Sequence, residues 1–123
     1  MGRPVGWLLE DESRAKLLDR FPPLYAEIIA HHVTLWGRKY RATPPDPAEI
    51  AVVGHADAGD GIEALVVTVD GNVHRPDGSH YHITWSLDPA SGKKPKDSNV
   101  LIADHDWEEI DPIPVTAVPA YIG

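Results

Sequence analysis

The sequence contains no cysteine, and this absence limits the chemistry that the chain can perform. Without thiols it has no disulfide framework, no thiolate nucleophile and no cysteine-ligated zinc site. No run of 18 apolar residues is present either, which excludes a membrane-spanning helix of ordinary length. The first ten residues hold one arginine and a short apolar segment, a pattern that does not fit a signal peptide. We therefore expect a cytoplasmic location.

Basic residues are scarce. The chain has 11 Lys and Arg against 19 Asp and Glu, with a formal net charge of −8. Proteins that hold long duplex nucleic acid usually carry a basic stripe, and here the clustered cations are Lys93, Lys94 and Lys96 alone. The charge balance argues against an extended duplex partner. It leaves room for a small anionic ligand or a nucleic-acid end in a local positive pocket.

The length of the chain and the placement of its turn and proline residues predict one domain over residues 1–123. The predicted class is α+β with an antiparallel sheet. Acidic cap residues at 11–13 and two prolines at 22–23 bound a predicted helix over 14–21. Alternating prolines and β-formers predict an edge strand over 110–122. Short apolar runs between turn residues predict the remaining strands, at 5–9, 26–37, 49–55, 62–69 and 79–87.

Two of these predicted strands carry the same four-residue pattern, in which a His and a Thr alternate with apolar residues. The pattern occurs at His32-Val33-Thr34-Leu35 and at His82-Ile83-Thr84-Trp85. Because side chains alternate along a strand, each His shares a face with its Thr. In the second strand, Tyr81, Ile83, Trp85 and Leu87 suit a core, and the opposite face carries His80, His82, Thr84 and Ser86. A strand face of imidazoles and hydroxyls suits a site better than a core.

A pair of imidazoles suits general acid–base catalysis, because histidine titrates near neutral pH. In the hydrolysis of a phosphodiester or cyclic phosphate, one imidazole deprotonates water and the other protonates the leaving oxygen. Hydroxyls such as those of Thr34 and Thr84 donate hydrogen bonds to phosphoryl oxygens. This scheme needs no metal and no cofactor.

Further residues are candidates for contacting a substrate. Trp36 shares the predicted face of His32 and is placed to stack on a base, and His80 shares the face of His82. By the same alternation His31 points away from His32 and is expected to be structural. The polar tract after the second motif adds candidate phosphate or substrate contacts at Lys94, Ser98 and Asn99.

The two motifs resemble the hallmark of the two-histidine (2H) phosphoesterases. The chain is most similar to the cyclic-phosphodiesterase domains of RNA-repair and tRNA ligases. The leucine-bearing helix before Pro22-Pro23 and the tract Lys94-Pro95-Lys96-Asp97-Ser98-Asn99 add to the likeness, which covers about residues 6–101.

The resemblance implies a compact antiparallel-sheet fold with one main N-terminal helix and a central cleft. It also implies a phosphoric diester hydrolase in which His32 and His82 are catalytic and Thr34 and Thr84 bind phosphate. The expected substrate is a small nucleotide or RNA terminus bearing a 2′,3′-cyclic phosphate, or a nucleotide-derived diester.

Two other functions fit the same residues. The chain could be a non-catalytic module that binds a nucleotide or an RNA end. It could also be a metal-dependent enzyme, because His80 and His82 have metal-ligand spacing on a strand. Further ligands for such a metal would come from His55, Asp57, His105 or Asp106.

Overall fold

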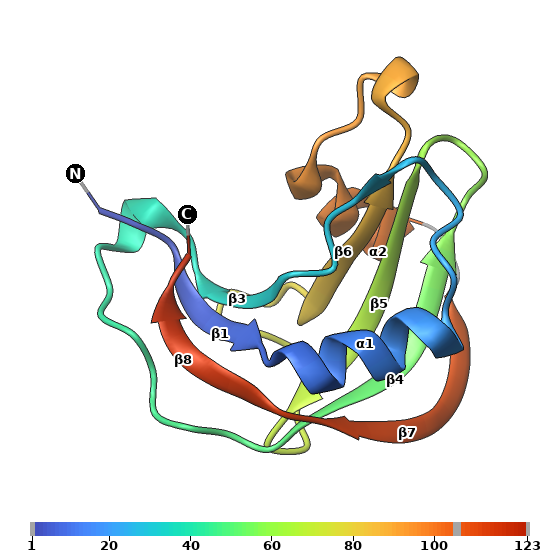
Figure 1. Ribbon diagram of the computed structural model, residues 1–123. Helices are drawn as coiled ribbons and strands as arrows, with labels where there is room; N and C mark the ends of the chain where they lie inside the picture. Colours follow the sequence, from blue (N-terminus) through green and yellow to red (C-terminus); the bar gives the residue numbers. More distant parts are fainter. Residues whose placement is uncertain (1, 105–106, 123) are drawn as a thin grey trace.

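Two antiparallel sheets organise the chain, as the computed structural model shows for residues 2–104 and 107–122 (Figure 1). One sheet has the strand order β3-β1-β8 and the other β2-β6-β5-β4-β7. Together with helices α1 and α2 they confirm the predicted α+β class. The strands are β1 (Val5–Leu9), β2 (Glu27–Ile28), β3 (His32–Trp36), β4 (Ile50–Asp57), β5 (Ile62–Val69), β6 (His82–Leu87), β7 (Glu108–Val115) and β8 (Ala117–Tyr121). The helices are α1 (Asp11–Arg20) and α2 (Ser98–Asp104), with short 3-10 turns η1 (Arg38–Tyr40), η2 (Pro89–Ser91) and η3 (Pro95–Asp97).

Helix α1 forms where the sequence predicts it. Asp11 and Glu12 occupy its first turn, where carboxylates favour the positive end of the helix dipole. Leu17 is buried in the main core, and Phe21 packs there immediately after the last turn. The two prolines that follow cannot continue the helix, so it ends before them.

The predicted strand over residues 26–37 is wrong in one respect, because it is two strands that belong to different sheets. β2 pairs with β6 and β3 pairs with β1. Ala30, between them, adopts a positive φ of 42°, which turns the chain out of one sheet and into the other. Its backbone N–H still donates to the Thr84 carbonyl at 3.0 Å, so β3 starts beside β6.

The alternation predicted for residues 79–87 holds only up to Trp85. Tyr81, Ile83 and Trp85 lie in the main core. Thr84 pairs with Ala64 of β5 and Ser86 pairs with Glu63, so two steps along β6 match one step along β5. Such a β-bulge reverses the alternation. The bulge places Leu87 in a second apolar cluster with Ala64 and turns Ser86 toward Glu63.

The C-terminal segment forms two edge strands instead of the single one predicted. β7 is the last strand of the larger sheet and β8 the last of the smaller sheet. Thr116 lies between them, and its backbone bonds to the start of α1 through Glu10 N–H at 3.0 Å and Ser13 Oγ at 2.8 Å. Figure 1 shows this segment sweeping from one sheet to the other. Prolines are tolerated here because an edge strand leaves one row of amides unpaired.

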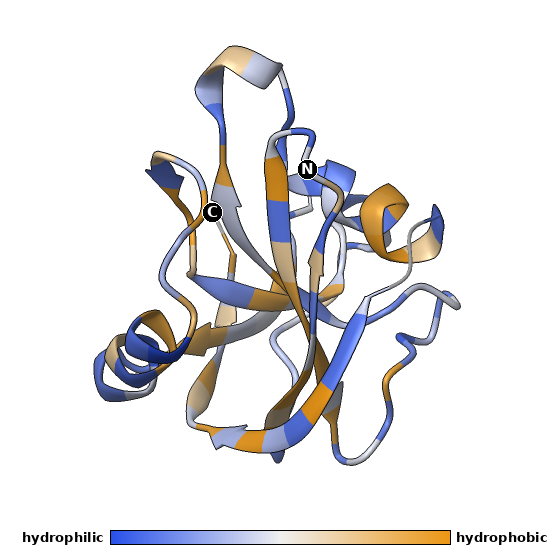
Figure 2. Ribbon diagram, turned by 90° about the vertical axis from the view of Figure 1, so that its right-hand side faces the viewer, coloured by the Kyte–Doolittle hydropathy of each residue, from blue (hydrophilic) through white to orange (hydrophobic). Residues whose placement is uncertain are grey.

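Apolar side chains form two clusters, one on each face of the larger sheet. The main cluster packs Leu65, Val67 and Ile83 against residues of β1 and α1, and the second packs Ala64 and Val66 against α2. The corresponding alternation of hydrophobic and hydrophilic segments is visible along the strands (Figure 2). Within the described residues, no helix has the length and apolar character needed to cross a bilayer.

Candidate active site

The two motif histidines line one open cleft. The cleft has a volume of about 690 Å³ and receives His32 from the smaller sheet and His82 from the larger one. The two sheets meet here because β3 and β6 are in contact, as Figure 1 also shows. The 50-residue spacing of the motifs therefore does not separate the two imidazoles in space.

Hydrogen bonds orient both imidazoles. His82 Nδ1 lies 3.0 Å from the His80 carbonyl oxygen, so this nitrogen carries the proton and donates. The Nε2 atom of His82 is then the proton acceptor of the neutral ring. His32 Nδ1 lies 3.0 Å from His31 Nδ1, and one of these two nitrogens donates to the other. His32 can therefore present either a donor or an acceptor at its Nε2 atom.

Both histidines are held uncharged at neutral pH. Burial lowers the pKa of His32 to about 4, and the nearby His31 and His82 rings contribute to the same shift. Burial likewise lowers the pKa of His82 to about 4, with added repulsion from Arg75 and His80. The bond to the His80 carbonyl opposes this shift in the pKa of His82 without cancelling it.

The cleft is positively charged although the chain as a whole is acidic. Among the described residues, four cationic side chains line it, Arg38, Lys39, Arg75 and Lys96, against the single carboxylate of Asp77. The net charge of the whole chain is −8. An anion gains from such a cluster because partly enclosed charges are screened less by salt than exposed ones.

Arg75 is the functional candidate that the sequence did not reveal. Its side chain is only 10% exposed and reaches three other segments. Nε donates to Ser79 Oγ at 2.6 Å, Nη2 to Asn99 Oδ1 at 3.1 Å and Nη1 to the Thr34 carbonyl at 3.4 Å. A guanidinium has five N–H donors, so these three bonds leave two, and Asp77 Oδ1 lies 3.7 Å from Nε as a carboxylate partner. The one local signal is its place immediately before the Pro76-Asp77-Gly78 turn that leads to the second motif.

The two motif threonines have different surroundings. Thr34 lines the cleft, whereas Thr84 does not. Thr84 is buried, and its Oγ1 lies 3.1 Å from the Pro95 carbonyl and 2.9 Å from the Ser98 hydroxyl. Pro95 is itself part of the cleft wall. Thr84 and Ser98 therefore support that wall from behind, and Asn99 lines the cleft together with Pro95 and Lys96 of the same tract.

Trp36 and His80 lie close to the cleft without lining it. Trp36 packs against Tyr40 with ring centroids 4.5 Å apart, and it is Tyr40 that lines the cleft. The His80 ring packs against His74, with ring centroids 4.6 Å apart. His80 acts on His82 both through its carbonyl and through charge repulsion that lowers the pKa of His82.

The lysine run predicted to be a basic cluster is divided by the fold. Lys93 pairs with Asp60 at 3.2 Å, and Lys94 is exposed, with its backbone N–H bonded to the Asp97 carboxylate at 2.8 Å. Lys96 alone of the three lines the cleft. The positive charge of the cleft comes mainly from positions scattered along the sequence.

His31 does not point away from His32 as alternation predicted. β3 begins at His32, so His31 lies before the strand and its ring meets that of His32 edge-on, with centroids 5.3 Å apart. It is exposed and supports the orientation of the His32 ring.

Residues 2–104 and 107–122 contain no set of ligands for the metal ion that the third hypothesis requires. No group of three or more His, Asp and Glu side chains there is arranged to hold an ion. His55 and Asp57 bond instead to Glu63 and Tyr25, at 2.7 Å each. The proposed ligands His105 and Asp106 lie outside the described residues.

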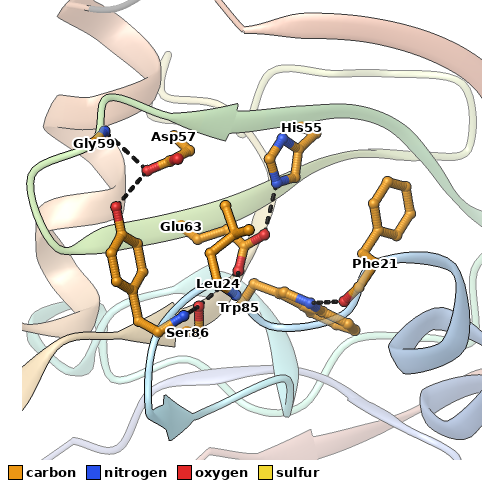
Figure 3. Close-up of polar contacts among 9 residues, drawn as sticks. Phe21, Leu24, His55, Asp57, Gly59, Glu63, Trp85 and Ser86 are labelled. Carbon is orange, nitrogen blue, oxygen red and sulfur yellow. Dashed lines mark hydrogen bonds and ion pairs between the residues drawn. The ribbon is translucent and has the colours of Figure 1, made fainter.

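A further histidine, His55, belongs to a different polar cluster, which we call the Glu63 cluster (Figure 3). Glu63 is 1% exposed and accepts three hydrogen bonds: from Ser86 Oγ at 2.6 Å, from Leu24 N–H at 3.1 Å and from His55 Nε2 at 2.7 Å. The bond to Glu63 is the main reason that the pKa of His55 is raised. Both oxygens of the Glu63 carboxylate are hydrogen-bonded, so the cluster joins β4, β5, β6 and the segment after α1.

Comparisons of the chain with protein-family models, with curated proteins and with solved structures found no match. A functional proposal therefore depends on the geometry and charge of the cleft.

Proposed function

We propose that this chain is a metal-independent phosphodiesterase that hydrolyses a 2′,3′-cyclic phosphate or a nucleotide-derived diester. The observation that carries the proposal is the pair of neutral imidazoles, one from each sheet, in a cleft whose other charged residues are nearly all cationic. The imidazoles supply proton transfer, and the cations select a phosphate.

The hydrogen bonds favour different roles for the two histidines. His82 Nε2 has a free lone pair because Nδ1 donates to the His80 carbonyl, so His82 takes the proton of the attacking water. Arg75 disfavours a positive charge on His82 and so lowers its pKa. His32 is therefore the general acid.

The reaction then balances in one step. The water oxygen forms a bond to phosphorus while its proton passes to His82 Nε2. The bond from phosphorus to one ribose oxygen breaks, and that oxygen takes the proton from His32. Charge that develops on the non-bridging oxygens is stabilised by Arg75 and the Thr34 hydroxyl, both of which line the cleft.

The placement of one His-x-Thr motif in each sheet supports the resemblance to the 2H phosphoesterases. Thr84 departs from that pattern, since its hydroxyl is engaged with Pro95 and Ser98. We assign its phosphate-binding role to Arg75, whose guanidinium offers two unused N–H donors. The compact 2H-like fold with a central cleft is part of the same proposal.

The decisive assay is hydrolysis of nucleoside 2′,3′-cyclic phosphates with excess chelator present. We expect turnover by the wild-type chain and a loss of about 10²- to 10⁴-fold in His32→Ala and in His82→Ala. His74→Ala is the matched control, because His74 is exposed and outside the cleft. Full activity in either cleft variant, or activity abolished by chelator, would exclude the proposed mechanism.

The pH profile gives an independent check. The profile of kcat/KM reports the pKa values of the free enzyme, and both cleft histidines have a pKa of about 4. The general acid is therefore rarely protonated before substrate binds, so kcat/KM should rise as the pH falls from about 7 toward about 5. Bound phosphate favours the imidazolium, so the profile of kcat should lie at higher pH.

The same low pKa values favour one alternative, a module that binds a nucleotide or an RNA end without reacting. With both histidines neutral, the cleft holds an anion through Arg75, Arg38, Lys39 and Lys96. Tight binding of a nucleoside 2′,3′-cyclic phosphate without product at any pH between about 5 and 8 would identify this function.

A further inference from the structure

The rings of His31 and His32 meet although the two residues are consecutive. Neighbouring side chains of an extended strand point to opposite faces, but His31 lies before β3 and follows Ala30, whose φ is 42°. The two Nδ1 atoms are 3.0 Å apart, and the ring planes are inclined at 84°. His32 lines the cleft, whereas His31 is exposed and lies outside the cleft wall. The contact therefore links a cleft imidazole to one that exchanges protons directly with water.

Backbone hydrogen bonds hold the segment that carries His31. The His31 carbonyl accepts from Leu9 N–H at 3.0 Å, and the Ala30 carbonyl accepts from Arg14 Nε at 2.8 Å. Ala30 N–H donates to the Thr84 carbonyl at 3.0 Å. Three elements, β1, α1 and β6, thus fix the backbone beside the His31 ring, so the contact between the two rings does not depend on a free loop.

Only one proton can lie between the two Nδ1 atoms, and its position sets what His32 offers in the cleft. A neutral imidazole has one N–H donor and one lone pair. If the shared proton belongs to His32, the Nε2 atom of His32 is an acceptor. If it belongs to His31, the one proton of neutral His32 is on Nε2, and this atom is a donor.

Burial decides which ring of the pair carries a positive charge. The pKa of His32 is lowered to about 4, first by burial and then by repulsion from His31 and His82. Exposed His31 keeps more of its hydration when charged, so a proton added to the pair charges His31. Both nitrogens of an imidazolium donate, so the shared proton then belongs to His31. Charged groups on the adjoining elements include Glu10 after β1, Arg14 of α1 and His82 of β6.

We propose that His31 is a positioning residue for the general acid, which fixes His32 as the Nε2–H tautomer and resupplies the proton that His32 gives away. This inference rests on the proposed function for the reaction that uses the proton. It explains how a buried imidazole that resists a positive charge can act as an acid at neutral pH, because the charge stays on the exposed ring.

The proton transfers balance. The leaving oxygen takes the Nε2 proton of His32 while the Nδ1 proton of His31 passes to Nδ1 of His32. Both rings are then neutral, and His32 has become the Nδ1–H tautomer. A proton from water, equal to the one that His82 releases, then binds His32 Nε2. The shared proton returns to His31, and the pair is ready for the next turnover.

The tautomers can be measured without substrate, by long-range ¹H–¹⁵N NMR spectra of the protein with ¹⁵N-labelled histidines. As the pH is lowered and His31 becomes charged, His32 should stay neutral with its proton on Nε2. His31→Phe, which keeps a ring without nitrogen, should abolish this coupled response of His32. A His32 tautomer that does not change as His31 titrates from its neutral form and keeps its proton on Nδ1 would overturn the inference, and so would a His32 that becomes charged before His31.

The kinetic test uses a nucleoside 2′,3′-cyclic phosphate and separates proton supply from orientation. His31→Phe should lower kcat by about 10- to 100-fold, with little change in KM because His31 does not line the cleft. His31→Asn keeps an amide donor for His32 Nδ1 but has no proton to give. It should therefore restore the Nε2–H tautomer in the NMR spectrum without restoring kcat.

His74→Phe is the matched control, because His74 is also exposed, lies outside the cleft wall and packs against another histidine ring, that of His80. It should act as wild type in both experiments. Wild-type kcat in a folded His31→Phe or His31→Asn variant would overturn the inference, as would a loss confined to KM or an equal loss in His74→Phe.

Failure of the proposed function is distinguishable from failure of this inference. If the wild type turns over no cyclic phosphate or other diester, the proposed function fails and the resupply of the proton fails with it. The NMR spectra then still decide whether His31 sets the tautomer of His32. If the wild type is active and the two rings titrate independently, the inference alone is overturned.

Discussion

The cleft and the Glu63 cluster place the same side chain in opposite electrostatic states. In the cleft, burial without a carboxylate partner lowers the pKa of His32 and His82 to about 4. In the Glu63 cluster, a bond to a buried carboxylate raises the pKa of His55. His55 joins β4 to β5 through Glu63 and also lines a hollow of about 260 Å³ beside Arg20 and Glu108, whereas the cleft rings lie in a larger hollow whose charged residues are mostly cationic. The comparison shows that a carboxylate partner raises the pKa of one buried imidazole, whereas burial without such a partner lowers the pKa of the other two.

The largest effect should come from removing the centre of the Glu63 cluster. Glu63→Ala leaves His55, Ser86 and the Leu24 N–H without their acceptor, which should lower the free energy of unfolding by about 3–5 kcal/mol. Chemical denaturation measures this change, with the exposed Glu27→Ala as the control. A loss below about 1 kcal/mol would mean that the cluster is not structural and would remove the contrast with the cleft.

The pH dependence of stability should separate the two regions. Because the folded pKa of His32 and His82 is lower than the unfolded value, the unfolded state binds more protons as the pH falls from 6.5 toward about 4. Stability therefore falls over that window, by about 3 kcal/mol per histidine at most, and His32→Gln/His82→Gln should reduce the fall.

His55 should act in the opposite direction. Its raised pKa contributes stability that is fully present below pH 6.5 and is lost as the pH rises through the folded value. His55→Gln should remove this alkaline loss and leave the acid limb unchanged. Denaturant midpoints measured from about pH 4.5 to 8.5 test both statements, and identical profiles for the two variants would refute the comparison.

A smaller effect is expected from Arg75 in the cleft. Arg75→Gln removes a charged donor to phosphate and should lower kcat/KM by about 10- to 100-fold. Arg75→Lys keeps the charge without the planar fork, so it should recover only part of the loss. Arg20→Gln is the control, and melting temperatures show whether the fold survives. Activity at the wild-type level in a folded Arg75→Gln variant would remove Arg75 from the site.

The smallest effects should distinguish the two motif threonines. Thr84→Val leaves the Pro95 carbonyl and the Ser98 hydroxyl without this hydrogen-bond partner. It should lower the free energy of unfolding by about 1–2 kcal/mol with little change in turnover. Thr34→Val should lower kcat/KM by up to about 10-fold and leave stability unchanged. The reverse outcome would assign phosphate binding to Thr84 after all.

Local patterns in the sequence predicted the helix and most strands because each depends on nearby residues. The cap and prolines around α1, and the β-branched runs of β4 and β5, are examples. The division at Ala30 was not predictable, because its positive φ is imposed by the meeting of two sheets and not by an alanine preference.

The candidate site was predictable only in part. The alternation of side chains correctly predicted that His32, Thr34 and His82 lie on exposed faces of their strands. It did not predict that residues of η3 and α2 would hydrogen-bond to the Thr84 hydroxyl. Lys96 was part of the predicted basic cluster, but Arg38, Lys39 and Arg75 were missed because they are distant from it in sequence and meet it only in the fold. Charge clusters of this kind depend on tertiary structure, which a linear pattern does not contain.

The hydrogen bond from Ala30 N–H to the Thr84 carbonyl has a consequence for how this cleft tolerates change. Ala30 is two residues before His32, and Thr84 is two residues after His82. This backbone hydrogen bond therefore holds the two strand segments that carry the rings at a fixed separation. The segments at 41–49 and 88–94 adjoin the lining residues Tyr40 and Pro95 without lining the cleft themselves, so insertions there would leave this contact between the two sheets in place. Under the proposed mechanism, the alignment of the acid and the base therefore depends on the junction of the two sheets and not on these loops.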